Sequence, residues 1–109
     1  MAFPMREQVE NIKPMDTEQL LSREDAEYQA QFVHQWTLNE QSIERTLSFK
    51  DFRDAIEFVN RAADVADAQD HHPDIHVYYN KVRLANSTHK VGGLTLNDFI
   101  LASALDQVV

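Results

Sequence analysis

Residues 52–84 read FRDAIEFVNRAADVADAQDHHPDIHVYYNKVRL, and their apolar pattern changes near Pro73. Between residues 52 and 68, apolar side chains recur at every third or fourth position, which is typical of a helix with buried sides. Between residues 75 and 84, apolar and polar side chains alternate around Asn80-Lys81, which predicts two strands joined by a tight turn. Pro73 should end the helix, because proline disfavours the helical conformation of the residue before it. This stretch therefore predicts a helix followed by a β-hairpin.

Similar patterns precede this stretch. Residues 22–25 form a Ser-x-x-Asp pattern that is typical of a capped helix start, and residues 26–33 continue with helical spacing. Residues 36–49 then alternate around a short polar turn at 39–41, which predicts a first hairpin. Ser48 is placed to cap the helix that follows this hairpin.

Thr95 and Asp98 form another capping pattern after the glycine pair, and they open a last helix. The predicted fold is α+β, a four-stranded antiparallel sheet with three helices on one face in the order α-β-β-α-β-β-α. The 109 residues suffice for one domain. We divide the chain into an N-terminal lead-in at residues 1–21, expected to be flexible or ordered on contact, and a single domain at residues 22–109.

Composition excludes several classes of function. The formal net charge of −8 argues against a nucleic-acid-binding surface, because phosphates are bound by lysine and arginine. The absence of cysteine excludes disulfides, thiolate metal sites and a cysteine nucleophile. No apolar run is long enough to span a bilayer, and no secretory leader is recognisable at the start. We therefore expect a cytoplasmic protein without a membrane or nucleic-acid partner.

Four of the five histidines lie in one short segment. Asp67 precedes His71 by four residues, so on a helix its carboxylate would share a face with the ring and orient it. His72 follows directly, and the second hairpin should return His89 towards both of them. Asp98 opens the next helix. Because histidine titrates with an unperturbed pKa of about 6.5, this group predicts an acid–base site.

Two of these residues also have a simpler interpretation. His71 could be a cation at a helix C-terminus, and Asp98 could only cap its own helix. His76 alternates away from its apolar neighbours and should lie on the surface. A three-histidine metal site is the rival of acid–base chemistry, although the spacing does not favour it. Trp36 and Tyr79 could be core aromatics or a stacking wall for a flat ligand.

The segment Asp67-Ala-Gln-Asp-His71-His72-Pro73, followed by Tyr79, His89 and Asp98, resembles the signature of the pterin-4a-carbinolamine dehydratase family. The resemblance covers about residues 22–109. Further matching segments are His76–Val82, Ser87–His89, Gly93–Thr95 and Phe49–Phe52. The chain departs from the family where Asp67 replaces a glutamate that is frequent there, and where Asn97 replaces a basic residue.

Members of this family dehydrate 4a-hydroxytetrahydropterin to quinonoid dihydropterin, without metal or cofactor. The resemblance implies acid–base roles for His71, His72 and His89. It implies supporting acids at Asp67 and Asp98, and substrate-binding aromatics at Trp36 and Tyr79. Some relatives act instead as dimerisation or assembly factors, which is the alternative function. The complete histidine set favours catalysis.

The predicted helix at residues 52–68 carries two apolar stripes. The first is expected to cover the sheet, and it comprises Phe52, Ile56, Val59, Ala63 and Ala66. The second has no evident partner in so short a chain, and it comprises Phe58, Ala62 and Val65. An unpartnered apolar surface predicts a contact between subunits. The resemblance implies a dimer of dimers, and the alternative is that residues 1–20 cover the second stripe.

Overall fold

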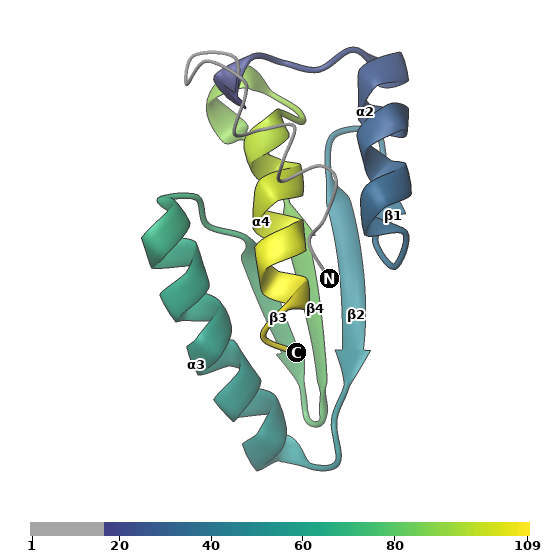
Figure 1. Ribbon diagram of the computed structural model, residues 1–109. Coiled ribbons are helices and arrows are strands. Elements are labelled where there is room, and N and C mark those ends of the chain that lie inside the picture. The colour runs from purple at the N-terminus through teal and green to yellow at the C-terminus, as the bar shows by residue number, and fades with distance from the viewer. Residues whose placement is uncertain (1–16) are drawn as a thin grey trace.

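The computed structural model describes residues 17–109, which form a four-stranded antiparallel sheet with three α-helices (Figure 1). The predicted α+β fold class is confirmed. The elements are α2 (Arg23–Ala30), the 3₁₀ helix η2 (Gln31–Val33), β1 (Thr37–Leu38), β2 (Ile43–Ser48), α3 (Phe52–Gln69), β3 (Asp74–Tyr78), β4 (Lys81–Asn86), the 3₁₀ helix η3 (His89–Val91) and α4 (Leu96–Asp106).

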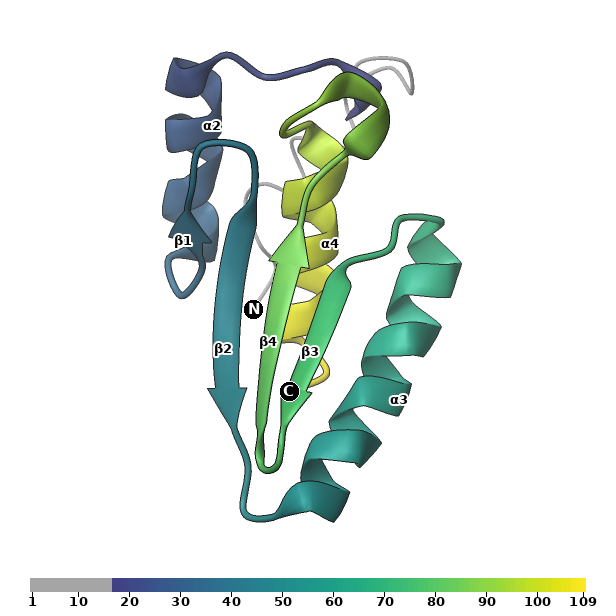
Figure 2. The same cartoon turned by 180° about the vertical axis from the view of Figure 1, so that it is seen from behind.

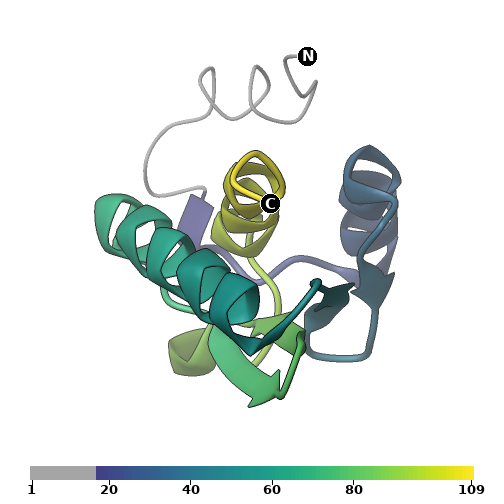
Figure 3. The same ribbon diagram turned by 90° about the horizontal axis from the view of Figure 1, so that it is seen from below.

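The strands are ordered β1-β2-β4-β3, so the two hairpins join through β2 and β4. In the second hairpin Asp74 pairs with Ala85, and between the hairpins Ile43 pairs with Asn86. The helices lie on one side of this sheet (Figure 3). Seen from behind, the strands lie in front of α4, and none of the α-helices described in residues 17–109 covers that face (Figure 2).

The central helix α4 supplies much of the core. Its predicted apolar stripe is buried, with exposed fractions between 0% and 7% at Leu96, Phe99, Ala102 and Leu105. The helix lies between α2 and α3 over the sheet (Figure 3). Both ends of α4 contact other parts of the domain. Asp98 in its first turn contacts His71, between α3 and β3, and Asp106 at its last residue contacts Trp36.

The structure buries most of the second stripe on α3, and of the first stripe only Ala66 is fully in the core. Phe58 and Ala62 are fully buried, and the Phe58 ring stacks on Phe49 with centroids 5.3 Å apart. Phe52, which was expected to cover the sheet, is 50% exposed. The two stripes lie roughly 100° apart around the helix, so periodicity alone could not tell which one faces the sheet. Residues 1–16 of the alternative covering segment lie outside the described part of the chain.

The predicted ends of α3 also require correction. Its N-cap is Asp51, whose side chain accepts a hydrogen bond from the backbone N–H of Asp54 at 2.9 Å. Ser48, the predicted cap, is instead the last residue of β2. The helix ends before Pro73, because Asp70 adopts the left-handed conformation with φ of 52°. This turn redirects the chain just before the histidine pair.

The tip of the second hairpin lies one residue earlier than predicted. Tyr79 and Asn80 form the turn, and Tyr79 rather than Asn80 has the positive φ, at 53°. The Asn80 side chain donates a hydrogen bond to the carbonyl of Phe49 at 3.0 Å. The asparagine therefore fastens the hairpin tip to the segment before α3 instead of supplying the unusual backbone angle.

The last residues of the predicted lead-in contact the domain. The Leu21 backbone N–H donates to the Leu94 carbonyl at 2.8 Å, and Lys90 forms an ion pair with Glu18. Residues 1–16 lie outside the described part of the chain. In residues 17–109, no helix combines the length and apolar character that crossing a membrane requires.

Candidate active site

His71 and Asp98 form a short contact where the end of α3 meets the start of α4. The His71 Nε2 atom lies 2.6 Å from Asp98 Oδ1, and the two side chains are 16% and 0% exposed. Because a carboxylate only accepts hydrogen bonds, the imidazole must donate from Nε2. Its Nδ1 atom has no hydrogen-bond partner within residues 17–109. Nδ1 is therefore the nitrogen of His71 that can take up or release a proton.

The second oxygen of Asp98 is held by two further donors. Oδ2 accepts from the Thr95 backbone N–H at 2.9 Å and from the Thr88 hydroxyl at 2.8 Å. The capping box of α4 is complete, because the Thr95 side chain accepts from the Asp98 backbone N–H in return. The sequence left open whether Asp98 caps its helix or supports a histidine. The structure shows that one carboxylate does both, through different oxygens.

His72 contacts the other predicted acid, with 3.0 Å between its Nε2 atom and Asp67 Oδ1. The four-residue spacing predicts Asp67 beside His71, and this prediction is wrong. The helical turn that would align those two residues is interrupted at Asp70. The His72 and Asp67 side chains are 59% and 78% exposed, so their attraction is weak and His72 is accessible to solvent.

His89 reaches the same end of the domain through the second hairpin. The register pairs Asp74 with Ala85, and beyond these ends His71 and Thr88 both donate hydrogen bonds to Asp98. His89 follows Thr88, begins η3 and is exposed. His71 and His72 lie in the segment between α3 and β3, and His89 lies in the segment after β4. Asp98 connects the two segments, because it accepts hydrogen bonds from His71 and from Thr88.

A charged pair lies next to His89. The hydrogen bond between Lys90 and Glu18 raises the pKa of the lysine and lowers the pKa of the glutamate, and their charge attraction acts in the same directions. Both groups therefore stay ionised over a wider pH range. The pair is exposed, so it contributes little to the stability of the fold.

The two predicted substrate-binding aromatics lie elsewhere. The Trp36 indole is 5% exposed, and its N–H donates to Asp106 Oδ1 at 2.8 Å. Asp106 lies eight residues beyond Asp98 on α4, a helical rise of about 12 Å. Tyr79 is at the hairpin tip, at the opposite end of β3 from the histidines. Within one chain, the structure does not bring either aromatic together with the histidines.

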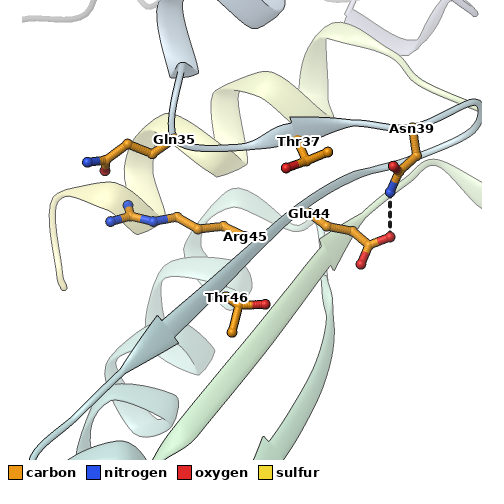
Figure 4. A pocket seen from close by; sticks show the side chains of 6 residues that line it. All are labelled: Gln35, Thr37, Asn39, Glu44, Arg45 and Thr46. Atoms are coloured by element: carbon orange, nitrogen blue, oxygen red, sulfur yellow. Dashed lines mark hydrogen bonds between the residues drawn. The ribbon is translucent and has the colours of Figure 1, made fainter.

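A polar hollow of about 430 Å³ lies beside β1 and β2, away from the histidines (Figure 4). Its lining residues are Gln35, Thr37, Asn39, Glu44, Arg45 and Thr46. Glu44 accepts hydrogen bonds from Asn39 and from Arg83, and Arg45 pairs with Asp106. The charged groups of this hollow already have partners within the chain, so it offers less chemistry than the histidine region.

The sequence reasoning missed the contribution of Thr88 and Asn86. Both lie on the inward face of the second hairpin, continuing the alternation of Val82 and Leu84. Thr88 donates to the Asp98 carboxylate, and the Asn86 amide donates to the Asp98 backbone carbonyl at 3.1 Å. One sequence signal could have identified these two residues: the inward positions change from apolar at 82 and 84 to polar at 86 and 88. A buried polar group needs a hydrogen-bond partner, so such a change indicates a buried polar contact.

The family model for pterin 4 alpha carbinolamine dehydratase matches residues 19–108. The chain belongs to this family. It is 43% identical to a protein of Nostoc punctiforme named as a pterin-4-alpha-carbinolamine dehydratase, over 83% of this chain and 97% of that one. It is 46% identical to a protein of Picosynechococcus with the same name, over 77% of this chain and 94% of that one.

A solved crystal structure has the same fold as this protein. The crystal structure of a transcriptional coactivator/pterin dehydratase from Brucella melitensis superposes with a TM-score of 0.78 and 28% sequence identity. The match covers 83% of this chain and 98% of the Brucella chain. Nearly the whole length of each relative thus corresponds to the described domain.

In residues 17–109, no three histidine, cysteine, aspartate or glutamate side chains are placed to hold one metal ion. His71 and His72 each face a different carboxylate, which separates them as candidate ligands. The geometry gives the rival three-histidine metal site no support. Catalysis without metal or cofactor stays a prediction.

Proposed function

We propose that the protein dehydrates a 4a-hydroxytetrahydropterin to the quinonoid dihydropterin, with His71, His72 and His89 as its acid–base groups. Family membership supports the reaction class. The observation that carries the proposal is the His71–Asp98 contact, because a buried carboxylate that holds one imidazole nitrogen leaves the other available for proton transfer. His72 and His89 supply two further accessible imidazoles at the same end of the domain.

The reaction requires two proton movements. The leaving hydroxyl on carbon 4a needs a proton, and the neighbouring ring nitrogen loses one as its electrons form the new double bond. Histidine can fill either role near neutral pH, and such help is typically worth roughly 10²–10⁴-fold in rate. Asp67 and Asp98 would orient the rings of His72 and His71 through their hydrogen bonds.

The first expected result is that the purified protein accelerates loss of the 4a-hydroxy intermediate. The intermediate would be generated in the spectrophotometer, and its first-order decay followed with increasing protein. We expect the rate constant to rise in proportion to protein concentration. A decay rate that does not change with added protein would contradict the proposal and favour the alternative of a non-catalytic assembly factor.

We also propose that the chain forms a homo-oligomer, a dimer of dimers. The support is a surface of α3 where Phe52 and Ala63 are exposed and Ile56 is partly exposed. The edge strand β3 offers a second surface, because its outer backbone groups have no strand partner in the sheet. Two separate surfaces on one chain suit two successive two-fold contacts.

Phe52→Glu should therefore lower the molecular mass of the assembly in solution. The new charge would enter an apolar contact without a partner, which disfavours association. Size exclusion with light scattering at micromolar protein measures the effect. Gln31→Glu adds the same charge at an exposed position next to α2 and should leave the mass unchanged. A wild-type protein that is already monomeric would refute the oligomer.

A further inference from the structure

The inward face of β4 and the segment after it changes character along its length. Val82 and Leu84 are buried and apolar, whereas Asn86 and Thr88 are buried and polar, with exposed fractions of 0% and 8%. Alternate residues of a strand share one face, so Val82, Leu84 and Asn86 point towards the helices. Thr88 lies two residues beyond β4, and its hydrogen bonds to Thr95 and Asp98 show that it points the same way. Burying a hydroxyl in place of an apolar group costs free energy unless it is hydrogen-bonded. The partners of Thr88 therefore indicate why a polar residue is present.

The Thr88 hydroxyl lies 2.8 Å from both Thr95 Oγ1 and Asp98 Oδ2. A hydroxyl has one proton to donate, and a carboxylate only accepts. Thr88 must then donate to Asp98, and Thr95 must donate to Thr88. The donors in this series of hydrogen bonds are therefore fixed. Thr95 donates to Thr88, Thr88 donates to the Asp98 carboxylate, and that carboxylate also accepts from His71.

This arrangement determines how the Asp98 carboxylate is oriented. Thr88 and the Thr95 backbone N–H both donate to Oδ2, which leaves Oδ1 facing His71. Without the Thr88 hydroxyl, one backbone donor would remain on Oδ2, and the carboxylate would be less restrained about its terminal bond. The His71 ring would then lose a fixed acceptor for its Nε2–H group.

We propose that Thr88 is a positioning residue, whose hydroxyl orients Asp98 and thereby keeps the proton of neutral His71 on Nε2 and leaves Nδ1 for proton transfer. The expected effect of Thr88 on the reaction rate rests on the proposed dehydratase function. Thr88 acts through Asp98 and requires no side-chain contact with the substrate. The tautomer itself can be measured whether or not the protein is an enzyme.

Thr88→Val is the direct kinetic test, since valine nearly matches the shape of threonine but lacks the hydroxyl. We expect kcat to fall about tenfold, the lower end of the loss that follows removal of an outer hydrogen-bond partner at a metal-bound histidine. KM should change little. Thr88→Ser, which keeps the hydroxyl, should restore most of kcat. Ser103→Ala, which removes a buried hydroxyl without a hydrogen-bond partner from α4, should leave kcat unchanged.

Wild-type kcat in a folded Thr88→Val variant would overturn the proposal. Equal losses of kcat in folded Thr88→Val and Thr88→Ser variants would also overturn it, because the hydroxyl would then not be the cause. Thermal melting of each variant shows whether it is folded.

The second test uses the ¹⁵N resonances of the histidine rings, which distinguish the two neutral tautomers. With His71 assigned from a His71→Gln variant, the wild-type protein should show neutral His71 protonated on Nε2. Thr88→Val should show a mixture of tautomers, and Thr88→Ser should resemble the wild type. Neutral wild-type His71 protonated on Nδ1 would overturn the proposal even if Thr88→Val did not fold. Absence of dehydratase activity alongside the expected tautomers would count against the proposed function and leave this positioning role supported.

Discussion

His72→Ala and His89→Ala should each lower the rate of dehydration by about 10²-fold or more, which is the typical contribution of a proton-transferring side chain. Both side chains are exposed, so their truncation should change stability by no more than about 0.5 kcal/mol. Steady-state rates and thermal melting should be measured on the same preparations. The combination of a large loss of rate and an unchanged melting temperature identifies a catalytic role.

The chain contains matched controls for this experiment. His76 lies on the uncovered face of the sheet and stacks on Tyr78, and His34 is exposed after η2. His76→Ala and His34→Ala should keep wild-type rates. Near-wild-type rates in both His72→Ala and His89→Ala would contradict the acid–base assignment, and so would equal losses in all four variants.

The largest expected effect on stability is at Phe58. Phe58→Ala should lower the free energy of unfolding by about 3–5 kcal/mol, because it removes a fully buried aromatic ring and leaves a cavity. The ring stacks on Phe49, and the Arg61 guanidinium lies 5.9 Å from its centroid, so the neighbours on both sides lose contacts. A loss of this size is a large fraction of the 5–15 kcal/mol that is typical of a whole domain.

Urea unfolding at a fixed protein concentration measures this loss, since association also contributes to apparent stability. Phe58→Leu keeps most of the apolar volume and should cost less, about 1.5 kcal/mol. A Phe58→Ala variant that dissociates but unfolds like the wild type would place Phe58 on a subunit contact, as the second stripe first suggested. Because Phe58 is buried within its own domain, we expect Phe58→Ala to unfold at a lower urea concentration than the wild type.

The sequence by itself determined the order of the elements and the fold class. Helical spacing in α3 and α4 and alternation in the two hairpins are local patterns, and each is specified by residues close together in the chain. The capping box of Thr95 and Asp98 was also predictable, because its two members are three residues apart. The end of α3 was less well predicted. The sequence predicted that Pro73 ends the helix, but the helix ends at Gln69 because Asp70 has a left-handed conformation.

Only the tertiary structure decided the partners of these residues. The orientation of α3 depends on packing against Phe49 and α4, so the sequence could show two apolar stripes but not which one is buried. The partner of His71 is Asp98, 27 residues away, rather than the nearby Asp67, because the left-handed turn at Asp70 interrupts the helical spacing. Hydrogen bonds between distant segments depend on how the elements pack, and local periodicity carries no information about that packing.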